Sequence, residues 1–87
     1  MDAANTLYQR LKILDPESID IVDESGAHIG HAGAVGGGSH FQLIIVSSVF
    51  NGHSLQSRHR MIYQAAGDLM GQSIHALAIK AYTPQEI

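Results

Sequence analysis

Residues 39–47 have the sequence Ser-His-Phe-Gln-Leu-Ile-Ile-Val-Ser, and this stretch decides the fold. Phe41, Leu43 and Ile45 alternate with a second row of residues that begins at His40. Strict alternation is the pattern of a β-strand with one face against a core. The stretch therefore predicts a strand, and the fold must supply a sheet around it and helices over its apolar side.

Two further stretches predict the other strands. Residues 18–23 place Ile19 and Ile21 on one face. Residues 74–82 form a third strand, in which His75 begins a row that continues with Leu77, Ile79 and Ala81. A glycine-rich loop separates the first strand from the second and a helix separates the second from the third, and we expect the three strands to form one sheet.

Two helices are predicted beside the strands. Residues 3–14 carry an apolar stripe of leucines, and Asp2 is a suitable N-cap. A second helix is expected from Ser54, its N-cap, to about Met70, with Gly71 ending it. Its expected buried stripe consists of Leu55, His59, Ile62, Ala66 and Leu69.

The resulting order is helix, strand, strand, helix, strand, followed by a helical stub capped by Thr83 with Pro84 at its first position. Such an order predicts an α+β, two-layer fold with a three-stranded mixed sheet and helices on one face. At 87 residues the chain is long enough for one domain, residues 1–87, and too short for two.

Composition excludes several classes of protein. The chain has no cysteine, which excludes a disulfide framework and any metal site built from its own thiolates. No apolar run approaches the ~18 residues of a membrane span, and the N-terminal residues lack the features of a signal or transit peptide. We therefore expect a soluble protein of the cytoplasm, or of the mitochondrial matrix in a eukaryotic host. Its net charge of −3 argues against general binding to nucleic acid.

Residues 24–38 are predicted to be a loop, because six of the nine glycines lie there. Glycine at this density carries a large ordering entropy, so the loop should be mobile. The loop contains His28 and His31. A long mobile loop in so small a domain is typical of a functional segment.

The chain contains six histidines, and histidine is the commonest metal ligand. His28 can move to a metal held by a partner, or be a solvated loop residue. His75 opens the last strand, where it is a ligand candidate or a half-buried histidine bonded to backbone. His31 and His40 are weaker candidates, and the remaining two are expected in a turn (His53) and in helix packing (His59). Two separated histidines without cysteine suit a metal site that another molecule completes.

Enzyme motifs are missing from the sequence. It contains no nucleophile elbow and no phosphate-binding loop, so no catalytic residue is predicted. Arg58, Arg60 and Lys80 are either solvated or form a small patch that contacts phosphate.

Several short motifs occur in an order that resembles the BolA family. They span nearly the whole chain and are Val22-Asp23-Glu24-Ser25, Ser39-His40-Phe41, Val46-Ser47, Phe50, Gly52, Arg58-His59-Arg60-Met61-Ile62-Tyr63, His75-Ala76-Leu77-Ala78-Ile79 and Tyr82-Thr83-Pro84. The resemblance implies a fold like the class II KH domain, without the Gly-x-x-Gly loop that binds nucleic acid in KH domains.

The resemblance also implies a function. BolA proteins pair with monothiol glutaredoxins and share a [2Fe–2S] cluster with the thiolates of glutaredoxin and glutathione. The ligands matching the family pattern are His75 and the loop residue His28, with His31 as the alternative loop ligand. We expect no cluster on the isolated chain, which should be a monomer or weak dimer without enzyme activity. Bacterial members are described as DNA-binding regulators, so DNA is the alternative partner, with Arg58, Arg60 and Lys80 as its contacts.

Overall fold

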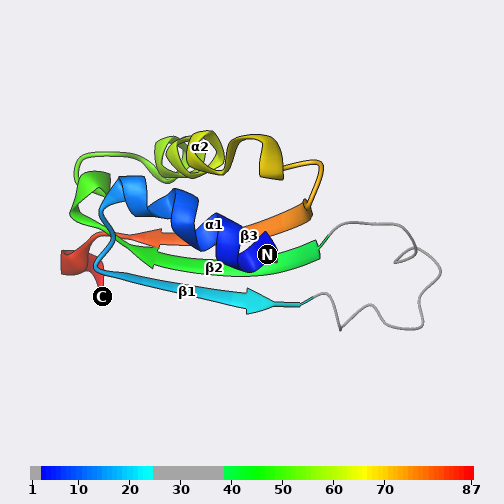
Figure 1. The fold of residues 1–87 in the computed structure, drawn as a ribbon. Helices are drawn as coiled ribbons and strands as arrows, with labels where there is room; N and C mark the ends of the chain where they lie inside the picture. Colours follow the sequence, from blue (N-terminus) through cyan, green and yellow to red (C-terminus); the bar gives the residue numbers. More distant parts are fainter. Residues whose placement is uncertain (1–2, 25–38) are drawn as a thin grey trace.

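The computed structural model describes residues 3–24 and 39–87. Its helices and strands are α1 (Ala3–Leu11), β1 (Ser18–Asp23), β2 (Ser39–Val46), α2 (Leu55–Ala66) and β3 (Ile74–Tyr82). Short 3₁₀ turns follow α1, β2, α2 and β3. This confirms the predicted α+β class and the predicted order of elements (Figure 1).

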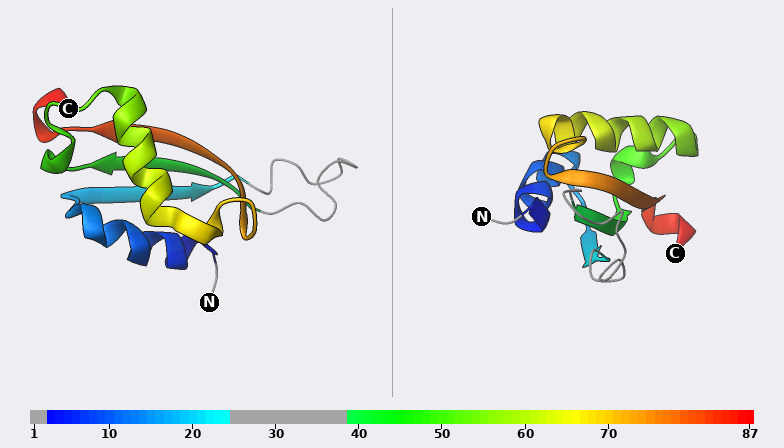
Figure 2. Two further views of the ribbon diagram at one scale, coloured as in Figure 1. Left: turned by 90° about the horizontal axis from the view of Figure 1, so that it is seen from above. Right: turned by 90° about the vertical axis from the view of Figure 1, so that its right-hand side faces the viewer.

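The three strands form one mixed sheet in the order β1-β2-β3. β1 runs antiparallel to β2, with Ile21 opposite Leu43, and β3 runs parallel to β2, with Ile79 opposite Leu43. Parallel neighbours need a crossover, which α2 supplies. Both helices cover the same face of the sheet, as the views in Figures 1 and 2 agree.

The core lies between the sheet and the two helices. The alternation predicted for β2 is confirmed, because Phe41, Leu43 and Ile45 are buried and the residues between them are more exposed, apart from Val46 at the strand end. The rest of the core comes mainly from both helices and β3: Leu7, Leu11, Leu14, Phe50, Ile62, Ala66, Leu69, Ile74 and Ala81. The second face of the sheet is not covered by a helix and carries both polar residues, such as Gln42 and Lys80, and apolar ones, such as Ile44.

Two predicted caps are confirmed. The Ser54 hydroxyl accepts a hydrogen bond from the Ser57 amide at 3.1 Å and so begins α2. At the other end of the chain, Thr83 and Glu86 form a reciprocal capping box around Pro84. Both caps depend on residues within three positions of one another, which explains why a sequence pattern predicts them.

The predicted buried stripe of α2 is confirmed at Ile62, Ala66 and Leu69, but it differs near the start of the helix. Leu55 is 65% exposed, whereas Arg58 is only 6% exposed. Arg58, Ile62 and Ala66 follow one another at intervals of four residues, so they form the inward face. Hydrophobicity alone could not predict that Arg58 is buried, because its guanidinium is bound by Ala81 of β3 and by Glu86 in the final turn.

The end of α2 also differs from the prediction. α2 ends at Ala66, and Gly67, with φ +57°, is its C-cap. Gly71, the predicted end, has φ +83° in the turn before β3. The Arg10 guanidinium donates to the Ala66 carbonyl at 2.8 Å and pairs with Asp68, and this contact lowers the pKa of Asp68. Gly67 therefore ends α2, and Arg10 of α1 caps the last carbonyl of the helix.

Substitution of Gly67 by alanine should destabilise the protein by roughly 1–3 kcal/mol, because L-residues rarely adopt its backbone angles. The added Cβ would also lie 3.2 Å from Arg10 Nη1. Urea unfolding of the Gly67→Ala variant measures this loss. An exposed helical position such as Gln64 gives the control, where Gln64→Ala should change stability by less than about 0.5 kcal/mol. Equal stability of the two variants would contradict the prediction.

Some predictions lie outside the described residues. They are the cap at Asp2, the mobility of the glycine-rich segment, and the positions of His28 and His31. Within residues 3–24 and 39–87, no helix has the length and apolar character that crossing a membrane requires.

Candidate functional site

His75 lies at the second position of β3 and its side chain is exposed. The pairing of β2 with β3 is irregular at this point. Ser39 is opposite Ile74, but the next residue of β2, His40, is opposite Ala76. His75 is therefore the extra residue of a β-bulge, a device that changes the direction of a side chain and is frequent beside functional sites.

The bulge corrects the prediction that His75 begins the row of Leu77, Ile79 and Ala81. Regular alternation would place His75 on the helix-covered face with that row. Ile74 takes the buried position instead, at 0% exposure, and His75 faces solvent. One inserted residue thus turns an imidazole away from the core, where it can reach a partner.

His40 is brought next to His75 by the parallel pairing of their strands. The two imidazole rings are stacked, with their centroids 5.1 Å apart and their planes inclined by 29°. His40 alternates with the buried Phe41, so the pair lies on the sheet face that the helices leave uncovered. The sequence interpretation treated His40 as a weak candidate. The missed signal was that both histidines lie near the starts of two strands, which meet at one sheet edge when the strands are parallel.

Backbone hydrogen bonds hold both ends of this site. The Ser39 amide donates to the Ser73 carbonyl at 3.0 Å, and the Gly71 amide donates to the Ile74 carbonyl at 2.9 Å. On the other side, the Glu24 amide donates to the His40 carbonyl at 2.7 Å. The ends of three strands are therefore joined, and β1 ends at the same edge where His40 and His75 begin their strands (Figure 1).

This edge suits a metal that is shared with another molecule. Residues 25–38, which contain His28 and His31, are bounded by Glu24 and Ser39, and both of these described residues lie at the same edge. Over the described ranges, no cluster of three or more histidine, cysteine or carboxylate residues could hold a metal ion. An exposed imidazole on a paired strand fits one ligand position of an iron–sulfur cluster, in which histidine can replace cysteine.

The predicted phosphate patch is not assembled as expected. The Arg58 guanidinium donates to both carboxylate oxygens of Glu86, at 2.7 and 3.0 Å. It also donates to the carbonyls of Ala81 and His53, both at 3.0 Å. The guanidinium therefore ties α2 to the end of β3 and the final turn. With 6% exposure, Arg58 does not present its charge to a phosphate, which corrects its predicted exposed position.

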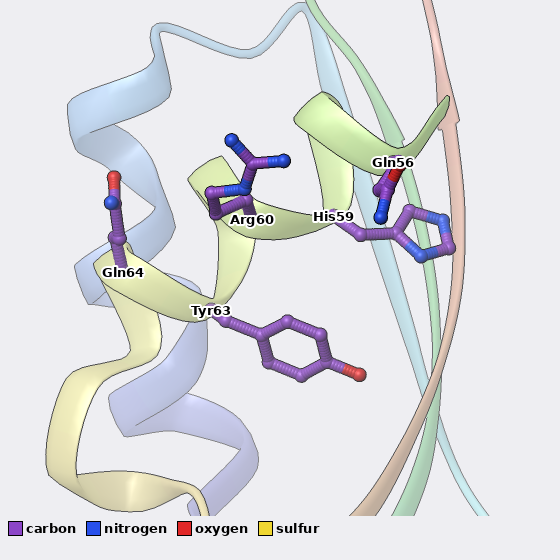
Figure 3. Close-up of a pocket in the computed structure, with 5 residues that line it drawn as sticks. All are labelled: Gln56, His59, Arg60, Tyr63 and Gln64. Atoms are coloured by element: carbon purple, nitrogen blue, oxygen red, sulfur yellow. The ribbon is translucent and has the colours of Figure 1, made fainter. Parts of the chain in front are cut away.

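Arg60 and Lys80 lie on opposite sides of the molecule. Arg60 is exposed on the outer face of α2. It lines a shallow open pocket with Gln56, His59, Tyr63 and Gln64 (Figure 3). Lys80 is exposed between the inward-facing Ile79 and Ala81, so it lies on the uncovered face of the sheet.

His53 lies in the turn where it was predicted, whereas His59 lines the open pocket on α2 and does not belong to the buried stripe. His53 is exposed in the turn before α2, and its Nδ1 lies 2.9 Å from the Ser57 hydroxyl. His59 is half-buried on α2. Because Arg58 joins His53 to Ala81, His53 lies near the far end of β3, about 20 Å of strand away from His75.

A comparison with known proteins identifies the family. The family model described as "BolA-like protein" matches residues 11–86. The chain belongs to this BolA-like family. The resemblance inferred from the motifs is thereby confirmed, and the match covers α2 and all three strands.

Relatives of the BolA-like chain show the same domain in different settings. It is 42% identical to human "BolA-like protein 1" over 84% of its length, and 39% identical to the "DNA-binding transcriptional regulator BolA" of Escherichia coli over 82%. The solved "BolA domain of SufE1 from Arabidopsis thaliana" is similar in structure, with a TM-score of 0.81 and 40% identity. That match covers 95% of this chain and 93% of the solved one.

The BolA-like chain spans 51% of the human relative and 65% of the E. coli relative. The similarity therefore concerns the domain. The activities and partners of those whole proteins are taken up below as proposals.

Proposed function

We propose that this BolA-like chain is a non-enzymatic partner of a monothiol glutaredoxin in the assembly, transfer or sensing of iron–sulfur clusters. It contributes histidine ligands to a [2Fe–2S] cluster that the two proteins share. The observation that carries the proposal is the β-bulge at His75, which exposes an imidazole at the edge of a paired sheet. Since the chain has no cysteine, the thiolates must come from glutaredoxin and glutathione.

The remaining ligand is assigned to the segment between β1 and β2. His28 matches the family pattern and His31 is the alternative. When the cluster is bound, it supplies the iron and the redox chemistry. The chain supplies neutral imidazoles, so the shared complex should weaken as the pH falls, because a protonated histidine cannot coordinate iron.

Mixing the chain with a monothiol glutaredoxin, iron, sulfide and glutathione tests this proposal. We expect a coloured complex that contains one copy of each protein and elutes as a heterodimer in size-exclusion chromatography. Glutaredoxin without the chain is the control, since it reports any cluster that glutaredoxin holds by itself. Separate elution of the chain from all cluster absorption would refute the proposal.

A second candidate function is sequence recognition on DNA, as the name of the E. coli relative suggests. The observation that favours it is the outer face of α2. This helix has no acidic residue, and Arg60 forms no ion pair with any residue that the structure describes. Amide, imidazole and phenol groups flank Arg60 (Figure 3). A helix of twelve residues that presents such groups fits the major groove of DNA.

Arg60→Ala should weaken DNA binding and lower the slope of log affinity against log salt by about 1, because one phosphate contact is lost. Lys80→Ala is the matched control. It removes an equal charge from the opposite side of the molecule, so both affinity and slope should stay unchanged. Fluorescence anisotropy at several salt concentrations measures both. Equal effects of the two variants would exclude the α2 face as the DNA contact.

A further inference from the structure

The stacked pair of His40 and His75 has a geometry that also suits the binding of a metal ion. The two residues are 35 positions apart, and only the parallel pairing of β2 and β3 brings them together. Imidazole nitrogens are good ligands for zinc and other divalent first-row metal ions. The pair therefore offers two such ligands from two adjacent strands of one sheet.

The separation of the rings fits a single ion between them. A Zn–N bond is about 2.0–2.1 Å and a ring nitrogen lies about 1.1 Å from its centroid, so two imidazoles at a tetrahedral angle have centroids about 5.2 Å apart. The observed distance is 5.1 Å. The stacked rings would have to turn about χ2 to direct a nitrogen from each toward the ion. That torsion is broad for histidine, so the turn needs no backbone movement.

The backbone around the pair is already ordered. Ser39, which precedes His40, donates its amide to the Ser73 carbonyl, two residues before His75. The main chain of His40 accepts a further hydrogen bond from Glu24. Because the backbone of both strands is already held, ion binding needs no ordering of the main chain, which lowers its entropy cost. Glu24 also places a carboxylate residue at this edge, which favours a cation.

We propose that His40 and His75 form a two-imidazole binding site for a divalent transition-metal ion, with water or a partner's groups completing its coordination. The site belongs to the chain by itself. It needs neither sulfide nor thiolate, so its test is independent of the test of the shared cluster proposed above.

Titration of the untagged full chain with Zn²⁺ alone, followed by isothermal calorimetry, tests the site. We expect one ion per chain. His40→Ala and His75→Ala should each lower the association constant at least about tenfold, since loss of an outer-shell partner alone costs 10–100-fold. The double variant should bind more weakly than either single variant, but by less than the product of the two single losses, because both side chains serve one site.

Two sets of variants make the result decisive. His53→Ala removes an exposed histidine from the far end of β3 and should bind Zn²⁺ like the wild type. His28→Ala and His31→Ala should also retain the ion. Imidazole ¹H–¹⁵N spectra should show that Zn²⁺ shifts the ring nitrogens of His40 and His75, which confirms binding in folded protein. Unchanged affinity in His40→Ala, or loss of the ion in His28→Ala or His31→Ala alone, would overturn the proposal.

Discussion

His75→Ala is expected to remove most of the visible absorption of the complex with a monothiol glutaredoxin. The imidazole is exposed and is held on a paired strand, so it needs little ordering before it binds iron. His28 belongs to a segment with six glycines in fifteen residues, whose ordering costs conformational entropy. His75→Ala should therefore reduce cluster stability more than His28→Ala does.

Visible and circular dichroism spectra of the mixed complexes between mildly acidic and neutral pH measure this effect. His53→Ala is the control and should leave the spectrum unchanged, since its imidazole contacts Ser57 of α2, far from His75. Folding of His75→Ala should be intact, because the side chain is not part of the core. The wild-type spectrum and the wild-type acid sensitivity in the His75→Ala complex would refute the assignment. Loss of absorption in His31→Ala without loss in His28→Ala would make His31 the loop ligand.

Arg58→Ala is expected to destabilise the protein more than Arg60→Ala, the substitution of the other arginine in α2. Its guanidinium satisfies two carbonyl groups and both oxygens of Glu86, and it lies 6.0 Å from the ring centre of Phe50. Its removal leaves the buried Ala81 carbonyl and the partly buried His53 carbonyl without this donor, which is costly. Arg60→Ala removes an equal charge from an exposed position and should change the free energy of unfolding by less than about 0.5 kcal/mol. Urea unfolding of both variants should show a clearly larger loss for Arg58→Ala, and similar stabilities would contradict the structural role of Arg58.

The same ion pair predicts how stability depends on pH. The side-chain hydrogen bond from Arg58, followed by the backbone hydrogen bond from Thr83, lowers the pKa of Glu86 from 4.5 to about 2. In the unfolded chain the carboxyl returns to its ordinary pKa. The stabilisation from this carboxylate is therefore fully present above pH 4.5 and is lost as the pH falls toward about 2.

Glu86→Gln should accordingly be less stable than the wild type at neutral pH, and the difference should shrink between pH 4.5 and 2. Glu17→Gln, at an exposed position, is the control and should follow the wild type throughout. Urea unfolding at a series of pH values measures both. A Glu86→Gln deficit that does not change with pH would show that the charge of Glu86 is not what stabilises the end of the fold.

The sequence by itself determined the elements of this protein. Alternation of apolar residues located all three strands, and the caps at Ser54 and Thr83 located the starts of two helical segments. These features depend on neighbours within a few positions, so their physical causes are visible in a linear pattern. The motifs in their order were also sufficient to indicate the family.

The tertiary structure decided the features that join distant residues. Arg58 can be buried because the Ala81 carbonyl and the Glu86 carboxylate accept hydrogen bonds from its guanidinium. Arg10 of α1 donates to the Ala66 carbonyl at the end of α2. His75 faces solvent beside His40 because β3 has one extra residue where it begins to pair with β2. Strand register and long-range hydrogen bonds arise between segments that the chain separates by many residues, so no local pattern specifies them.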